Sequence, residues 1–159
     1  MPNIAVTPAS EQELADRDVR LFVYRDFLAR GIPPSVADTA RALRINAAEI
    51  VESYDRLAAA HVIVLRQGTR EILMAAPLSA VQTRFRVALA DGRSRWANCV
   101  WDALGVAAML HQDATIHASC GDCDEALTLT VRRGKLEQAD GVVHFAVPAA
   151  RWWEDIVFT

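Results

Sequence analysis

Cys99 and Asp102 are the first residues whose types and spacing suggest chemistry. They stand three residues apart, so on a helix they would share one face. A helix N-terminus favours the thiolate form of a nearby cysteine, which would make Cys99 a nucleophile or a soft-metal ligand. The Asp102 carboxyl could then carry or relay a proton. The same spacing is also consistent with a buried structural cysteine beside a solvated aspartate.

Cys120 and Cys123 form a second motif, with Gly121 and Asp122 between them. A CxxC pair in a tight turn can chelate a metal ion or exchange thiols. A structural zinc site usually needs four ligands, however, and the chain has no second CxxC pair. Three roles therefore remain open for this pair: a structural turn, a soft-metal or redox site, and a zinc site.

The segments around Cys99 predict a strand, a turn and a helix. Residues 83–89 alternate in polarity as a strand does. Residues 94–110 contain few helix breakers, which predicts a helix capped by Ser94 with Cys99 in an early turn.

The first half of the chain has mainly helical signals. Residues suited to N-caps open three successive helical segments, at Ser10, Ser35 and Asn46. Strand-like runs follow at residues 61–65 and 71–75, joined by a turn. Three helices followed by a hairpin are typical of a winged helix. We therefore predict an α+β chain that begins with a winged-helix-like domain.

The predicted boundary lies near Pro77, with one domain over residues 1–76 and a second over 77–159. In a winged helix that binds DNA, the third helix enters the major groove. Here that segment carries Glu49, Glu52 and Asp55 against a single arginine, and the whole chain has 17 Lys+Arg against 20 Asp+Glu. This charge does not suit binding to phosphates, so nucleic acid is not an expected partner.

The composition also indicates a cellular location. No apolar run approaches the roughly 20 residues that cross a membrane, and the N-terminus lacks a signal-peptide pattern. We therefore expect a cytoplasmic protein with no membrane partner. In that compartment, the three cysteines are expected to be free thiols, metal ligands or catalytic groups rather than disulfides.

The residues from Arg86 to Gly105 resemble the core of the alkylmercury lyases (MerB). The resemblance is carried by Leu89-Ala90-Asp91-Gly92 and by an aromatic-x-x-Cys-x-x-Asp-x-Leu pattern in residues 96–104. It implies a winged-helix-like domain followed by an α/β domain with antiparallel strands. The paired strands of that family would correspond here to residues 116–120, 127–131, 142–148 and 152–159.

The resemblance implies protonolysis of a carbon–mercury bond, which releases a hydrocarbon and leaves Hg(II) as bound product. Cys99 would be the first mercury-binding thiol, and Asp102 would carry the proton and also hold Hg(II). Trp96 and Trp101 flank Cys99, and they would either wall an apolar pocket for the organic group or belong to the core. No cofactor is required, and a thiol reductant would release the product.

One departure from the family pattern concerns the second catalytic cysteine. In the family it follows a strand like residues 155–159, whereas this sequence ends at Thr159. Cleavage is therefore expected to be impaired. Three explanations remain open: a shortened chain, substitution by Cys120 or Cys123 as the second thiol and metal ligand, and loss of lyase chemistry. The alternative function is a non-catalytic soft-metal-binding or winged-helix regulatory protein on the same fold.

Overall fold

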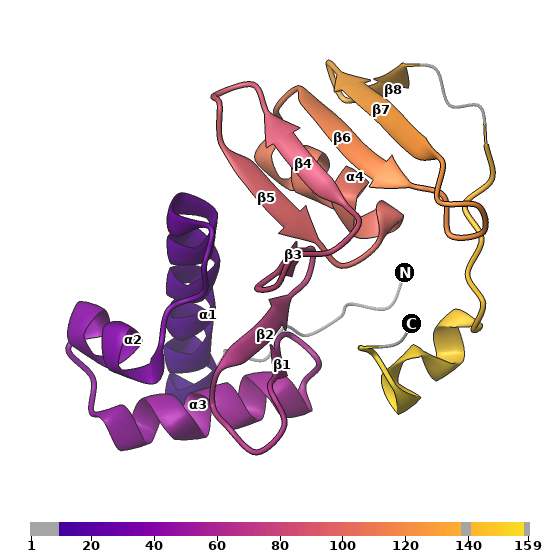
Figure 1. The fold of residues 1–159 in the computed structure, drawn as a ribbon. Coiled ribbons are helices and arrows are strands. Elements are labelled where there is room, and N and C mark those ends of the chain that lie inside the picture. Colours follow the sequence, from indigo (N-terminus) through magenta and orange to yellow (C-terminus); the bar gives the residue numbers. More distant parts are fainter. Residues whose placement is uncertain (1–9, 138–140, 158–159) are drawn as a thin grey trace, which may run out of the picture.

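The N-terminal helices begin where the capping signals predict, in a computed structural model that describes residues 10–137 and 141–157 (Figure 1). The helices are α1 (Glu11–Arg30), α2 (Val36–Leu43) and α3 (Ala47–Ala59). Ser10 and Ser35 each complete a capping box, and the Asn46 side chain accepts a hydrogen bond from the N–H of Ala48. α1 ends at Gly31, whose left-handed φ of 80° is free of steric cost only for glycine.

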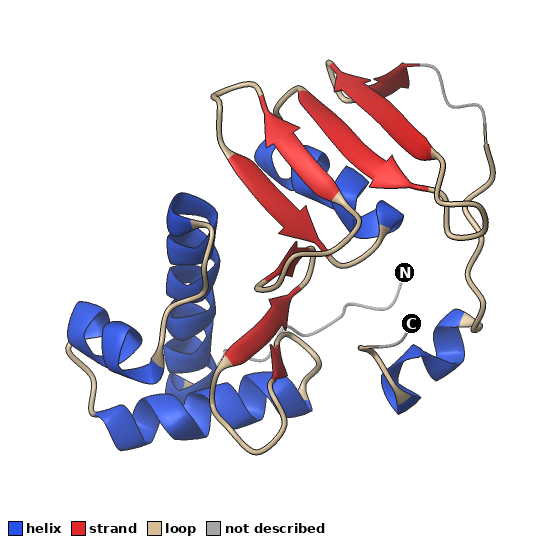
Figure 2. Ribbon diagram, in the orientation of Figure 1, coloured by secondary structure: helices blue, strands red, loops and turns tan. Residues whose placement is uncertain are grey.

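An antiparallel sheet of eight strands follows the three helices, together with one further α-helix and a short C-terminal 3-10 helix (Figure 2). The strands are β1 (Val64–Leu65), β2 (Ile72–Ala75), β3 (Leu78–Ser79), β4 (Arg86–Leu89), β5 (Ser94–Ala97), β6 (Ala114–Ser119), β7 (Ala126–Arg132) and β8 (Lys135–Glu137). Their order in the sheet is β1-β2-β3-β5-β4-β6-β7-β8. The predicted α+β class with antiparallel strands is confirmed.

The sheet and its core continue across the predicted domain boundary. The cis peptide bond Ala76–Pro77 lies between β2 and β3, which pair with each other. Buried side chains of the helices, such as Val19 and Ile50, belong to the same hydrophobic cluster as Val87 and Ile116 of the sheet. The division into two domains, and the winged-helix description of the first, stay predictions.

α4 (Val100–Leu110) covers one face of the sheet, where it contacts β4, β5 and β6 (Figure 2). Val87, Arg95 and Ile116 are opposite one another in the register and are all buried. Their neighbours in the pleat, Arg86, Trp96 and His117, therefore point to the other face.

Arg95 of β5 connects the sheet to the end of α1. Its side chain is only 7% exposed, and its guanidinium donates hydrogen bonds to the carbonyl oxygens of Leu28 and Ala29. These carbonyls belong to the last turn of α1, where the helix dipole presents partial negative charge. Burial lowers the pKa of Arg95, the expected direction for a cation removed from water.

Three sequence predictions about secondary structure are wrong. Residues 94–97 form strand β5 rather than the start of a helix, because they pair with β4 on one side and with β3 on the other. Of the predicted strand at residues 61–65, only Val64–Leu65 pairs, since His61 has a left-handed φ of 60° and the N–H groups of His61 and Val62 donate to carbonyls of α3.

The third correction concerns the C-terminal segment. Residues 142–148 form no strand in the described structure, and Ala149–Glu154 form the 3-10 helix η1. Pro148 precedes η1 with φ −58°, a value that suits a helix start, and its missing N–H cannot donate to a strand neighbour. The last two residues of the predicted strand at 152–159 lie outside the described range. Among the described helices, none is both long and apolar enough to cross a membrane.

Candidate functional site

Cys99 is the N-cap of α4. Its backbone is extended, and its Sγ accepts a hydrogen bond from the N–H of Asp102 at 3.3 Å. The sulfur thus takes the place that a serine or threonine oxygen usually has at a helix start. The sequence predicted Cys99 inside the helix; the structure places it one residue before the first turn, directly after β5 and Asn98.

Burial raises the pKa of the half-buried Cys99 thiol. The backbone N–H groups of Asp102 and Trp101 lower it, as expected at a helix N-terminus, but this effect is smaller than that of burial. The expected thiolate is therefore not favoured in the free protein. A soft metal ion that binds to Cys99 has to displace the thiol proton.

Asp102 lies beside Cys99 and is also half-buried. Its Oδ2 accepts a hydrogen bond from Nδ2 of Asn98 at 2.9 Å. Burial raises the pKa of Asp102, while the hydrogen bonds with Asn98 and with the Cys99 thiol oppose this rise. The structure thus brings the two predicted residues into hydrogen-bond contact, and it keeps the carboxyl protonated to a higher pH than an exposed aspartate.

Asn98 is a residue that the sequence analysis missed. It joins β5 to the N-cap, and its Oδ1 is buried without a hydrogen-bond partner among the described residues. An unpaired buried acceptor is unusual in a folded protein. No pattern of spacing identifies an asparagine of this kind, because its importance depends on the contact with Asp102.

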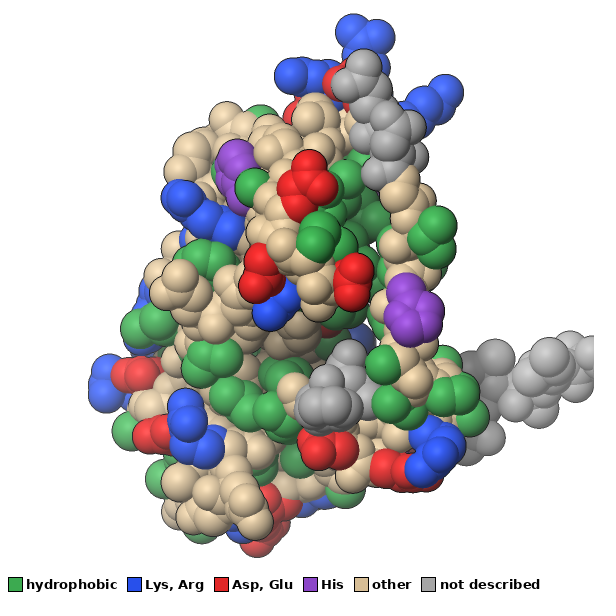
Figure 3. All heavy atoms as spheres, turned by 45° about the vertical axis from the view of Figure 1, so that its right-hand side comes forward, with side chains coloured by type: hydrophobic (Ala, Val, Ile, Leu, Met, Phe, Trp, Pro, Cys, Tyr) green, Lys and Arg blue, Asp and Glu red, His purple; other side chains and the backbone are tan. Residues whose placement is uncertain are grey.

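Trp101 lines an open pocket of about 480 Å³ next to this helix start. The other lining residues come from the C-terminal segment: Phe145, Ala146, Val147, Pro148, Ala149 and Trp152. Hydrophobic side chains lie on both sides of the hollow between this segment and the rest of the molecule (Figure 3). Trp96, the other predicted pocket residue, points to the opposite face of the sheet and does not line this pocket.

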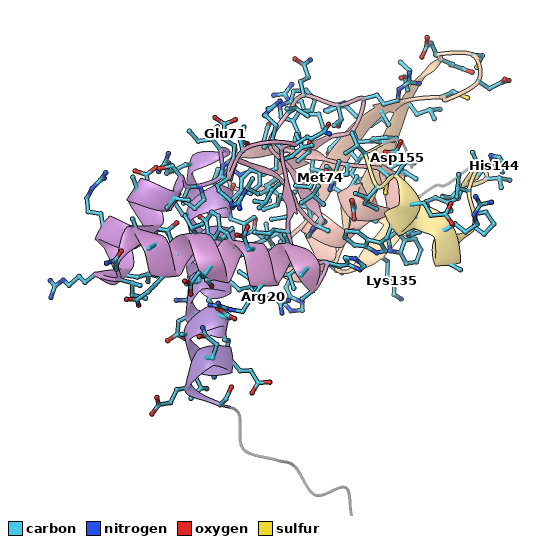
Figure 4. The ribbon with its side chains drawn as sticks, turned by 90° about the horizontal axis from the view of Figure 1, so that it is seen from below. Arg20, Glu71, Met74, Lys135, His144 and Asp155 are labelled. Atoms are coloured by element: carbon cyan, nitrogen blue, oxygen red, sulfur yellow. The ribbon has the colours of Figure 1, made fainter. Side chains whose placement is uncertain are left out.

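Aromatic side chains of the C-terminal segment contact one another and His61. Trp153 stacks on His61 with ring centroids 3.8 Å apart and an angle of 6° between the planes. Trp152 donates a hydrogen bond from Nε1 to the carbonyl of Val147, and its ring lies 5.0 Å from that of Phe145. His144 lies at the outer edge of the segment, away from α4 (Figure 4). The segment therefore presents its apolar side to Trp101.

Cys120 and Cys123 lie in the turn between β6 and β7. The N–H of Asp124 donates to the carbonyl of Cys120 at 3.1 Å, and the N–H of Cys120 donates to the carbonyl of Glu125 at 2.9 Å. Hydrogen bonds from the backbone N–H groups of Cys123 and Asp122 lower the pKa of Cys120. Both cysteines are free thiols, and Cys123 is exposed.

Cys99 and the Cys120–Cys123 turn lie at the same end of the sheet. The chain just before β4 contacts both connections: Thr83 donates from Oγ1 to the carbonyl of Ala97 at 2.6 Å, and Arg84 donates to the carbonyl of Cys120 at 3.4 Å. β5 and β6 flank β4, so their ends are two strand spacings apart, about 10 Å. No group of three or more Cys, His, Asp or Glu residues in the described part could hold a metal ion.

Comparison with known proteins identifies one family. The family model for alkylmercury lyase (MerB) matches residues 78–159, which is more than half of the chain. No curated protein sequence matches significantly. Among solved structures, the mercury-bound form of MerB2 is similar, with a TM-score of 0.62 and 25% sequence identity, over 77% of this chain and 59% of that one.

Proposed function

Because this chain belongs to the alkylmercury lyase family, we propose that it binds an organomercurial through Cys99 and cleaves the carbon–mercury bond with a proton from Asp102. The observation that carries this proposal is the contact between these two half-buried side chains at the start of α4. The similar MerB2 structure contains mercury, which supports the choice of metal. This chain spans 59% of the length of that protein.

The first step is capture of the metal. Thiolates are soft ligands that select soft metals such as mercury. In the exchange, the S–H bond of Cys99 and the bond from mercury to its counter-ligand break, an S–Hg bond forms, and the proton leaves with the counter-ligand. The raised pKa of Cys99 makes this proton release part of binding.

The second step is proton transfer. Sulfur bonded to mercury weakens the carbon–mercury bond, and the protonated Asp102 carboxyl gives its proton to the carbon. The hydrocarbon leaves, and the resulting carboxylate becomes the second ligand of Hg(II) beside Cys99. Two thiols from solution then take the metal and return one proton each to Cys99 and Asp102.

The organic group is proposed to occupy the pocket beside Trp101. The pocket opens beside Trp101, which lies two residues after the N-cap Cys99. Its walls are aromatic and aliphatic. Apolar walls favour an aryl or alkyl group over a charged one. Trp96 remains a candidate for contact with the organic group only because it lies three residues before Cys99 in the sequence.

The experiment uses phenylmercury in the presence of excess thiol. We expect the wild-type chain to release benzene, the Cys99→Ser variant to neither bind nor cleave, and the Asp102→Asn variant to bind but release at least about 100-fold less benzene. Asp55→Asn is the matched control, since Asp55 lies on α3 in a surface ion pair with Arg70. Binding without benzene release by the wild-type chain would make the protein a soft-metal binder rather than a lyase.

A further inference from the structure

The turn between β6 and β7 holds two thiols that the proposed cleavage does not use. We propose that Cys120 and Cys123 form a separate two-thiolate site for Hg(II). The inference concerns metal binding alone, so it does not depend on proton transfer at Asp102.

The turn places both sulfurs on one side. The hydrogen bond from the N–H of Asp124 to the carbonyl of Cys120, 3.1 Å, makes this a single helical turn of backbone. Residues three apart on such a turn point in the same direction. Gly121, which follows Cys120 in this turn, has no side chain, and the space around its Cα is open.

The turn is held from outside by Arg84. Its guanidinium donates to the carbonyl of Cys120 at 3.4 Å and to Oδ1 of Asp124 at 3.2 Å. The pairing of Cys120 with Glu125 closes the same turn from the strand side. The sulfur atoms are therefore presented by a backbone that has little freedom to separate them.

Two thiols and no further ligand fit a soft ion that accepts two ligands. The described part of the chain has no group of three Cys, His, Asp or Glu residues, which disfavours zinc and its usual four ligands. Hg(II) is satisfied by two thiolates. In the reaction, two S–H bonds are replaced by two S–Hg bonds, and two protons go to the solvent.

A second thiol on the same turn acts at a high effective concentration. When a monothiol in solution displaces one sulfur, the other keeps the metal attached, and the first returns before the metal leaves. Such bidentate binding exceeds single-site binding by roughly 100-fold or more. The site is exposed at Cys123, and it lies at the same end of the sheet as Cys99.

The test removes Cys99, so that only the turn can bind. The full-length Cys99→Ser chain is reduced, loaded with mercuric chloride and challenged with increasing glutathione, and the retained Hg(II) is read by native mass spectrometry. We expect one Hg(II) per chain, retained to roughly 100-fold more glutathione than in Cys99→Ser chains that also carry Cys120→Ser or Cys123→Ser. Ser119→Ala on the same background is the matched control and should retain the metal.

Equal retention by the Cys99→Ser chain and the two double variants would overturn the proposal. So would rapid loss of the metal from all of them. Because none of these chains contains Cys99, failure of the proposed lyase activity has no influence on the result.

Discussion

At the scale of single residues, the site is defined by a sulfur that caps a helix. Cys99 accepts the N–H of Asp102 in the free protein, so the thiol and the carboxyl are placed before any substrate binds. Burial raises the pKa of both groups, and this favours a thiol and a carboxyl that each carry a proton. In the proposed cycle, the Cys99 proton is released when the metal binds, and the Asp102 proton is given to carbon.

Asn98 is expected to set the pH range of cleavage. Its hydrogen bond lowers the pKa of Asp102, so the Asn98→Ala variant should have an Asp102 pKa above that of the wild type. Because Asp102 must be protonated to deliver its proton, activity falls as pH rises through this pKa. The alkaline limb of the pH profile for benzene release should therefore move to higher pH in the variant.

The control for this prediction is Ser94→Ala, which removes a side chain that accepts a hydrogen bond from Arg86 on the other face of the sheet. Its pH profile should match the wild type. An Asn98→Ala profile with a lower rate but an unmoved alkaline limb would mean that Asn98 only supports the fold.

At the scale of elements, the helices are connected by a charged network. Asp16 of α1 accepts two hydrogen bonds from Arg56 of α3, at 2.8 and 2.9 Å, and one from Ser53 at 2.6 Å. Asp16→Asn should lower the free energy of unfolding at neutral pH by about 1–3 kcal/mol, measured by urea denaturation. Asp18→Asn on the exposed side of α1 is the control and should change it by less than about 0.5 kcal/mol.

The same network makes the stability of the fold depend on pH in the acid range. The hydrogen bonds from Arg56 lower the pKa of Asp16 below its ordinary value of 3.8. The stabilisation that ionised Asp16 gives to the fold is therefore fully present above pH 3.8, and it is lost as the pH falls through the lower pKa of the folded state. The difference in stability between wild type and Asp16→Asn should shrink in that acid range. A difference that stays constant there would contradict the assigned role of Asp16.

Sequence patterns predicted the elements that local signals control. Caps at Ser10, Ser35 and Asn46 locate three helix starts, because their side chains bond to backbone N–H groups nearby. Strand β5 was missed, since its extended form depends on pairing with β3 and β4 rather than on its own residues. The short strands β3 and β8 were missed for the same reason.

The candidate site was predicted only in part. The spacing of Cys99 and Asp102 and the resemblance to a family pointed to these two residues, which the structure places next to each other. Three features depend on tertiary contacts. They are the effect of Asn98 on the pKa of Asp102, the opposing effects of burial and of the helix N-terminus on the pKa of Cys99, and the pocket between Trp101 and the C-terminal segment. Such contacts leave no periodic signal in the sequence.

At the scale of the whole molecule, Arg95 makes the helices and the sheet depend on each other. Its buried guanidinium pairs with the carbonyls of Leu28 and Ala29. Arg95→Met should lower the free energy of unfolding by roughly 2–4 kcal/mol, since it removes the charged donor that joins β5 to these carbonyls, and only Arg93 still donates to Leu28. Arg86→Met, on the exposed face of the neighbouring strand, should change stability much less.

The shared core also predicts a single unfolding transition for the wild type. All four tryptophans lie beyond residue 77, whereas much of the helical signal comes from α1 to α3. Tryptophan fluorescence and far-ultraviolet circular dichroism should therefore follow one denaturation curve. Two separate curves would mean that the helices and the sheet fold as independent units.

The most direct test of the central claim follows the hydrogen atom that reaches carbon. The wild-type chain is equilibrated in heavy water with excess thiol and mixed with phenylmercury, and the benzene is analysed by mass spectrometry. Proton delivery from Asp102 predicts benzene with a single deuterium, formed by the wild type, at least about 100-fold less by Asp102→Asn, and not by Cys99→Ser. Absence of benzene from the wild-type reaction, or equal formation by Cys99→Ser, would contradict cleavage at the Cys99–Asp102 site.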